Sequence, residues 1–135
     1  MSTSISRYAD GVKCYSRING TVEEICIPKI ILKTTELYQV LKAHDIVYIS
    51  KYGSFSKIHY TNRTTWLLSS SINSLFKKLS SFSFFKRINT NLIVNEQYIS
   101  AIRQDEYQEL ILDTGEEFVF NNDCLSKLLN NHKLV

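Results

Sequence analysis

The sequence of 135 residues lacks most of the features that mark membrane, secreted and low-complexity proteins. One proline and four glycines argue against a long disordered linker. No apolar run reaches the roughly 18 residues of a membrane span, and the first residues contain no apolar segment of a secretory signal. We therefore expect a cytoplasmic protein with no membrane partner. At this length the chain should form one domain, with or without a short arm.

Chemically reactive side chains are also few and scattered. The three cysteines form no Cys-x-x-Cys pair and the three histidines lie far apart, so the sequence predicts no metal site. A glycine-rich phosphate loop, a nucleophile elbow and a His-Glu-x-x-His motif are all missing. We therefore expect no enzyme, no cofactor and no small-molecule substrate. The cysteines should be reduced, buried thiols, and His59 should lie on the surface of a strand.

The most informative absence is that of acidic residues from the middle of the chain. Residues 1–45 carry six basic and five acidic side chains, and residues 96–135 carry three basic and eight acidic ones. Residues 46–95 carry seven basic side chains and no aspartate or glutamate. If the lysines only keep the surface of this segment hydrated, the basic residues are explained but the absence of acidic residues is not. A surface that faces anions accounts for both.

Short β-forming runs, separated by turn residues about every eight to twelve positions, fill most of the chain and predict a mainly β fold. Hairpins are predicted around three turns, at Asn19-Gly20, Thr61–Arg63 and Thr114-Gly115. Asn-Gly is favoured in two-residue hairpin turns because both positions need a positive φ. Pro28 marks the expected boundary between an N-terminal arm with a hairpin, residues 1–28, and the main domain, residues 29–135.

Two stretches depart from the β pattern and predict short helices. In the first, apolar residues recur at i, i+3, i+4 and i+7 on one helical face, at Ile72, Leu75, Phe76 and Leu79. One of the serines of Ser69–Ser71 can cap its start, and Lys77 and Lys78 fall in its last turn, where cations suit the helix dipole. In the second, a shorter apolar stripe is formed by Leu125, Leu128 and Leu129. Asn122 or Asp123 is the expected cap of this C-terminal helix.

Four stretches of the chain follow one another in an order that points to a known family. They are "DIVYIS" with "KYGSFSKIHY", then "TTWLLSSSINSLFKKL", then "FFKRINTNLIVNEQYISAI", and last "LILDTGEEFVFNNDCLSKLL". Taken together they resemble the LytTR family, the DNA-binding output domain of many bacterial response regulators. The third stretch resembles the most specific motif of that family, which it matches at Phe85, Arg87, Ile88, Ile93, Val94, Asn95, Tyr98 and Ile99.

The resemblance implies stacked antiparallel sheets, a β sandwich with a short central helix and a short C-terminal helix. It also implies that three loops from one edge reach into successive DNA grooves, here Lys51–Phe55, Asn89–Asn91 and Asn121–Asp123. The sequence departs from the family at two of these loops. Asn89–Asn91 stands where the family usually has His-Arg-Ser, and Asn121–Asp123 stands where it often has Ser-Arg-Arg. Up to three arginine or histidine contacts are thus replaced, and an aspartate is present instead.

The loops and the acid-free segment together supply a set of candidate DNA-binding residues. These are Lys51, Tyr52, Ser54, Phe55, Lys57, Lys77, Lys78, Lys86, Arg87, Asn89, Thr90, Asn91 and Asn122. Asparagine can read adenine, and threonine can bond a phosphate or contact a thymine methyl group. Lys86 and Arg87 could anchor phosphates, but Arg87 could equally pair with a carboxylate and support the loop from behind. Asn89–Asn91 is then either a polar tip that enters a DNA groove or simply a hairpin turn.

The sequence therefore predicts a sequence-specific DNA-binding transcriptional regulator of bacterial type, with double-stranded DNA as its partner. Residues 1–28 are too few to form a receiver domain that accepts a phosphoryl group. The chain could work alone, as a homodimer on repeated half-sites, or as part of a longer protein. The alternative is a LytTR-like protein-interaction module that has lost tight DNA binding. The replaced arginines favour this alternative, and the acid-free segment opposes it.

Overall fold

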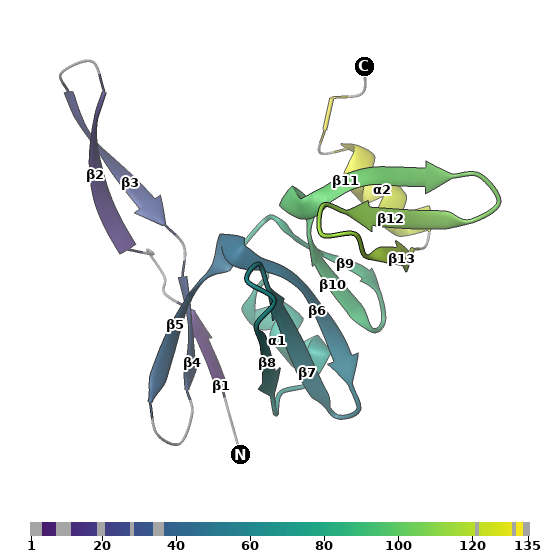
Figure 1. Cartoon of the computed structure of the whole chain (residues 1–135), viewed down its shortest axis with the longest axis horizontal. Coiled ribbons are helices and arrows are strands. Elements are labelled where there is room, and N and C mark those ends of the chain that lie inside the picture. Colours follow the sequence, from purple (N-terminus) through teal and green to yellow (C-terminus); the bar gives the residue numbers. More distant parts are fainter. Residues whose placement is uncertain are drawn as a thin grey trace.

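The computed structural model describes residues 4–7, 12–18, 21–27, 29–33, 37–120, 122–130 and 132–133. Its strands form antiparallel sheets stacked in layers, and two short α-helices complete the fold (Figure 1). The predicted fold, mainly β with a short central helix and a short C-terminal helix, is confirmed. Within the described part of the chain, no helix has the length and hydrophobicity needed to cross a bilayer.

A five-stranded sheet lies at the centre of the fold. Its strands follow the order β8 (Thr65–Leu68), β7 (Phe55–Tyr60), β6 (Ile46–Tyr52), β10 (Leu92–Asn95) and β9 (Phe85–Asn89). A second sheet contains β1 (Ser4–Arg7), β4 (Lys29–Lys33) and β5 (Tyr38–Lys42), and a third contains β11 (Ile99–Gln104), β12 (Gln108–Leu112) and β13 (Glu117–Val119). A separate pair contains β2 (Val12–Ile18) and β3 (Thr21–Ile27). The helices are α1 (Ile72–Lys78) and α2 (Asn122–Asn130), and the short 3-10 turns are η1 (Ala43–Asp45) and η2 (Glu96–Tyr98).

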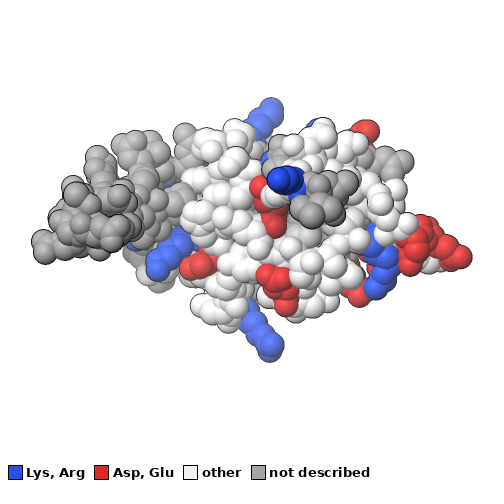
Figure 2. Space-filling model, turned by 90° about the horizontal axis from the view of Figure 1, so that it is seen from above, with Lys and Arg blue, Asp and Glu red and all other residues white. Residues whose placement is uncertain are grey.

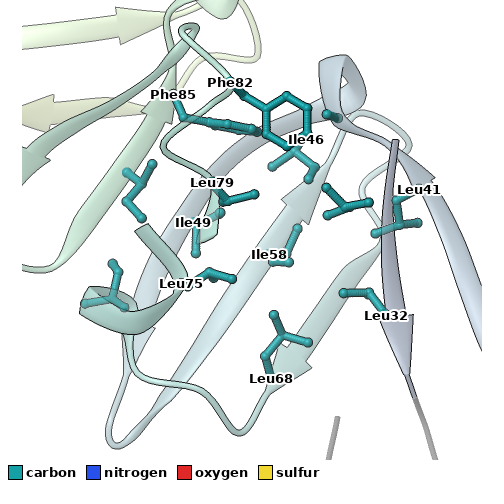
Figure 3. Close-up of a cluster of buried hydrophobic side chains, with 14 of the residues drawn as sticks. Leu32, Leu41, Ile46, Ile49, Ile58, Leu68, Leu75, Leu79, Phe82 and Phe85 are labelled. Carbon is teal, nitrogen blue, oxygen red and sulfur yellow. The ribbon is translucent and has the colours of Figure 1, made fainter. Parts of the chain in front are cut away.

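The central sheet is a middle layer because a hydrophobic core lies against each of its faces. The first core joins it to β4, β5 and α1 and is formed by Ile30, Leu32, Leu41, Ala43, Ile46, Ile49, Ile58, Leu68, Ile72, Leu75, Leu79, Phe82, Phe84, Phe85 and Ile93 (Figure 3). The second core joins it to β12 and α2 and is formed by Val47, Ile88, Leu92, Val94, Leu110, Leu112, Phe120, Cys124 and Leu128. The two cores hold the three layers together.

Strand β10 shows most clearly that both faces are covered. All of its residues are buried, with Ile93 in the first core and Leu92 and Val94 in the second. A strand covered on both faces has no solvent side, so apolar residues occupy consecutive positions. Asn95 ends the strand and is buried too, and its Nδ2 donates to the carbonyls of His44 and Ile46 at 3.2 and 2.9 Å. These bonds offset the cost of burying its amide.

Helix α1 begins and is capped as the sequence predicts. The Oγ of Ser71 accepts a hydrogen bond from the backbone N–H of Ser74 at 3.2 Å. Ile72, Leu75 and Leu79 are buried, and the partly buried Phe76 packs beside them. The prediction that these residues share one buried helical face is therefore confirmed. The exposed lysines of the last turn lie on the opposite side of the helix.

Helix α2 differs from the prediction in its start and in its buried face. It begins at Asn122, so Asn122 and Asp123 lie in its first turn and do not precede it as caps. Cys124 and Leu128 are its buried residues, whereas Leu129 is 39% exposed. The predicted stripe of three leucines was wrong at Leu129. The helical face that packs on the second core is centred on Cys124 and Leu128, which are four residues apart, so Leu129 points partly to solvent.

The predicted hairpins after residue 55 are confirmed. β7 pairs with β8 across a turn in which Arg63 has a φ of 66°, and β12 pairs with β13 across Gly115, with a φ of 101°. The expected Asn19-Gly20 turn lies outside the described residues, although its flanking strands β2 and β3 pair along their whole length. Strand β1 was not predicted, and it pairs with β4 across the expected boundary at Pro28. That boundary stays a prediction.

Candidate nucleic-acid interface

The tip, residues 89–91, is the turn between β9 and β10, and the side chain of Asn89 shapes it. The Oδ1 of Asn89 accepts a hydrogen bond from the backbone N–H of Asn91 at 2.8 Å. Its Nδ2 donates to the carbonyl of Val119 at 3.2 Å, which ties the tip to the third sheet. An asparagine that bonds the backbone two residues onward stabilises a turn locally. Asn89 is therefore engaged inside the domain, whereas Thr90 and Asn91 are exposed.

Arg87 supports the tip from behind. Its Nε donates to the carbonyl of Asn89 at 3.0 Å, and its Nη2 donates to the carbonyl of Thr90 at 2.7 Å. The guanidinium carbon lies 5.7 Å from the centre of the Phe76 ring, within the range of a cation–π contact. Arg87 therefore supports the tip through backbone carbonyls rather than through a carboxylate, and its contact with a phosphate stays a prediction.

The turn between β6 and β7 lies directly beside the tip. The backbone N–H of Lys51 donates to the carbonyl of Asn91 at 2.9 Å, beyond the last pair of the β6–β10 ladder at Ser50 and Leu92. Gly53 closes this turn with a φ of 62°, a conformation that costs glycine little. Two of the three predicted DNA-contacting loops are therefore neighbours (Figure 1).

A groove separates the tip from the start of α1, and we name it the α1 groove. Its volume is about 430 Å³, and it is lined by Lys51, Gly53, Ser54, Ser71, Ile72, Asn73, Arg87, Thr90 and Asn91. The sequence prediction missed Ser71 and Asn73 as neighbours of the tip. A signal existed, because a helix that follows β8 must start close to the β6–β7 turn once β7 and β8 pair as a hairpin.

A second groove, the α2 groove, separates the other side of the tip from α2. Its volume is about 280 Å³, and it is lined by Arg87, Ile88, Asn89, Thr90, Asp123, Cys124 and Lys127. The third predicted loop therefore also meets the tip, through the first turns of α2. Lys127 was missed, although it follows Asp123 by four residues and so lies on the same helical face. The backbone of Asn122 opens α2, and Asn121 lies outside the described residues.

The other predicted residues line neither groove. Lys77 and Lys78 are exposed at the far end of α1. Lys86 lines a cavity of about 240 Å³ that adjoins the α2 groove, since both are lined by Arg87, Cys124 and Lys127. Tyr52 and Lys57 lie on the opposite face of the central sheet from α1, together with Phe55. Consecutive residues of a strand point to opposite faces, so strand periodicity already separates Tyr52 from Lys51.

Two reactive side chains, His59 and Cys124, are wholly or partly buried in the fold. His59 is half-buried and stacks on Tyr48 with ring centres 3.9 Å apart, and its Nε2 lies 3.1 Å from the Oγ of Ser50. Burial lowers its pKa, Lys57 lowers it further, and Glu116 opposes the shift. Cys124 is a buried thiol whose pKa is raised by burial against the opposing effect of Lys127 and Lys86. Cys14 and Cys26 lie outside the described side chains.

No cluster of three or more histidine, cysteine or acidic side chains that could hold a metal occurs within the described residues. The acidic residues that follow residue 95 gather mainly on the third sheet and its turns. Arg103 of β11 pairs there with Glu109 at 2.9 Å and with Glu117 at 4.0 Å. Figure 2 shows the molecule from above, the side away from the β6–β7 turn, where acidic and basic side chains are interspersed.

Comparisons with known proteins agree with this geometry. A family model described as the LytTr DNA-binding domain matches residues 36–132. A solved Bacillus cereus chain, named as the LytTr DNA-binding domain of a methyl-accepting/DNA response regulator, superposes with a TM-score of 0.60 and 22% identity, covering 76% of this chain and 94% of that chain. At that identity the likeness shows the fold alone. No curated protein matches the chain. Because the family model spans the central sheet, the third sheet and both helices, the chain belongs to the LytTR family of DNA-binding domains, which is not a family of enzymes.

Proposed function

We propose that this domain is a sequence-specific transcriptional regulator that binds double-stranded DNA through the tip and the two grooves beside it. The observation that carries the proposal is the meeting of three loops, distant in sequence, around Arg87. The strands that supply the tip and the β6–β7 turn come from the segment without carboxylates. A bacterial, cytoplasmic setting fits this function.

The division of roles within the tip follows from its hydrogen bonds. Both backbone groups of Asn91 are used, its N–H by Asn89 and its carbonyl by Lys51, so its position is fixed while its side chain is exposed. An immobile backbone with an exposed amide suits recognition of a base edge, because asparagine pairs with adenine through one donor and one acceptor. Thr90 suits a phosphate or a thymine methyl group. We therefore assign base reading to Asn91 and turn formation to Asn89.

Phosphate contacts belong to the cations that border the grooves. Lys51 borders the α1 groove, Lys127 borders the α2 groove, and Arg87 reaches both. Contacts of this kind position a protein on the duplex and supply affinity that depends on salt, whereas base contacts supply specificity. Lys86 and the two lysines that end α1 extend the positive charge beyond the grooves.

The alternative function, a protein-interaction module without tight DNA binding, is favoured by two specific observations. The side chains of Arg87 and Asn89 form hydrogen bonds that hold the tip in place. In addition, Asp123 lines the α2 groove where the family often has arginine. Fewer side chains are therefore available for DNA than the family pattern implies. The acid-free character of the α1 groove still favours DNA over a protein partner.

Selection of bound sequences from random duplex DNA tests the proposal. A regulator that reads bases should enrich a defined motif, and a pair of enriched motifs at constant spacing would identify binding as a homodimer on repeated half-sites. Measuring the dissociation constant by fluorescence anisotropy on the enriched duplex and on a scrambled duplex gives the specificity ratio. Failure to enrich any motif, with equal affinity for both duplexes, would favour the interaction module.

A further inference from the structure

One part of the central sheet is covered by neither core. Within the second core, the central sheet contributes residues of β6, β9 and β10, and none of the core residues comes from β7 or β8. On the other side, Ile58 and Leu68 of those two strands are fully buried in the first core. Among the described residues, the part of this face next to the β6–β7 turn therefore lies outside both cores, whereas His59 near the other end of β7 is half-buried against Tyr48.

The residues on this uncovered face follow from the strand alternation. Ser56 and Ile58 are buried toward α1, so Phe55 and Lys57 point the other way, and Leu67 does so beside the buried Leu68. Tyr52 joins them because it pairs directly with Phe55 across the β6–β7 turn. We name Tyr52, Phe55, Lys57 and Leu67 the open face.

The open face exposes large apolar side chains around a cation. The exposed fractions are 58% for Tyr52, 39% for Phe55 and 48% for Leu67. Lys57 pairs with Leu67 in the β7–β8 ladder, and its Nζ lies 5.6 Å from the centre of the Tyr52 ring. Exposed rings cost free energy in water, so a cluster of them usually marks a binding surface.

The identity of the occupant is indicated by the charge at the centre of this surface. Lysine is depleted from the cores of protein–protein interfaces, because its ammonium group would have to be desolvated there. Surfaces for single-stranded nucleic acid instead combine aromatic rings, on which bases stack, with cations that follow the phosphate backbone. β6, β7 and β8 contain no aspartate or glutamate that would repel such a strand.

We propose that the open face binds single-stranded DNA, with unpaired bases stacked on Tyr52 and Phe55 and the backbone held by Lys57. This site differs from the duplex-binding site, because none of the open-face residues lines either groove, although Gly53 and Ser54 of the same turn line the α1 groove. The length of single-stranded DNA that this face can hold is limited by Glu116, which shares a cavity with Tyr48 and His59 at the opposite end of β7. The carboxylate of Glu116 repels phosphate. The bound single-stranded DNA should therefore cross the rings of Tyr52 and Phe55, with about two or three bases in contact.

The test uses a fluorescent single strand of about 12 thymidylates, whose bases stack but do not form a duplex. We expect the full chain to bind it at low salt. Tyr52→Ala and Phe55→Ala should each weaken binding by about fivefold to a hundredfold, the usual range for losing one stacked base. Tyr52→Phe, which keeps the ring, should retain the wild-type affinity, and Lys57→Gln should weaken binding and reduce its salt dependence.

Tyr107→Ala is the matched control, because Tyr107 is 64% exposed but stands on the acidic β11–β12 turn. It should leave single-strand binding unchanged. Asn91→Ala should also leave it unchanged while impairing recognition of the selected duplex, so the two activities can fail independently.

The proposal is overturned if the wild-type chain does not bind the single strand, or if the double variant Tyr52→Ala/Phe55→Ala binds it as tightly as the wild type. Sedimentation of the same variants identifies the rival occupant. A wild-type oligomer that becomes monomeric in the double variant, with unchanged single-strand affinity, would make the open face a contact between copies of the chain. Circular dichroism of each variant establishes that it is folded.

Discussion

The two grooves beside the tip share Arg87 and Thr90 but differ in charge. Among the described residues that line it, the α1 groove has Lys51 and no carboxylate, whereas the α2 groove has Lys127 together with Asp123. A phosphate at the α1 groove would meet attraction alone, and one at the α2 groove would meet attraction and repulsion within a single helical turn. The comparison teaches that the departures from the family pattern do not weaken the interface evenly. The departure at the tip borders both grooves, but the carboxylate of Asp123 lines the α2 groove alone, so the α1 side should contribute more of the affinity.

The largest effect should come from Arg87, because it serves both grooves. Arg87→Ala removes two charge-assisted hydrogen bonds to the tip and should lower the free energy of unfolding by about 2 kcal/mol. Duplex affinity should fall at least about tenfold, since the tip loses its shape and both grooves lose a cation. Arg87→Lys should not restore either property, because an ammonium group lacks the planar fork that spans two carbonyls. Urea unfolding and anisotropy check this, and full rescue by lysine would show that charge alone matters.

The next largest effects should come from the two asparagines of the tip, which should differ in whether they alter binding or stability. Asn91→Ala should cost about 1–3 kcal/mol of binding on the selected duplex and relax preference at one or two base pairs, with stability unchanged. Asn89→Ala should instead lower the free energy of unfolding by about 1 kcal/mol, because it breaks the bonds to Asn91 and Val119. Competition with single-base variants of the duplex measures the preference. The opposite pattern, with Asn89 setting preference, would contradict the assignment.

Replacing either of the two groove lysines should have a smaller effect, on the salt dependence of duplex binding. Lys51→Gln should flatten the dependence of log affinity on log salt by about one unit, as expected for one lost phosphate contact. Lys127→Gln should flatten it less, because Asp123 already offsets part of its charge in the α2 groove. Anisotropy titrations at several salt concentrations give both slopes. Equal slopes for the two variants would remove the proposed difference between the grooves.

The smallest effect should come from the carboxylate itself. Asp123→Asn keeps the shape of the side chain but removes its repulsion, so duplex affinity should rise by a factor of about two to five at low salt. The variant should also lose up to about 1 kcal/mol of stability, because a negative charge suits the first turn of a helix. A thermal melt measured beside the binding titration distinguishes these effects. Weaker binding by a fully folded variant would place Asp123 in a favourable contact with DNA.

Much of the fold could be predicted because its local signals agree with its tertiary structure. The alternating runs of β6, β7 and β12, and the serines before α1, specify strands, turns and a cap within a few residues of each other. Strand β1 could not be predicted, because a four-residue segment with few apolar positions gains its stability only by pairing with β4. The exposure of Leu129 also depends on which side of α2 meets the second core, and periodicity alone leaves that open.

The candidate site was harder to predict than the fold. The three loops were predicted from their resemblance to a family, but the hydrogen bonds that engage Arg87 and Asn89 within the domain were not predicted. The sequence left open whether Arg87 supports the loop, because its bonds to the carbonyls of Asn89 and Thr90 depend on the backbone path of the hairpin. Local sequence also does not indicate that Val119, from the third sheet, accepts from Asn89. The bond between Asn89 and Val119 exists only after the layers are stacked.

The salt dependence of binding to the selected duplex tests the central claim most directly. If Lys51, Arg87, Lys127 and one further cation contact phosphates, log affinity should fall with log salt at a slope of roughly −3.5. That slope should be reduced in Lys51→Gln. A slope near zero, or no binding to any duplex at low salt, would contradict DNA binding through the tip and its grooves.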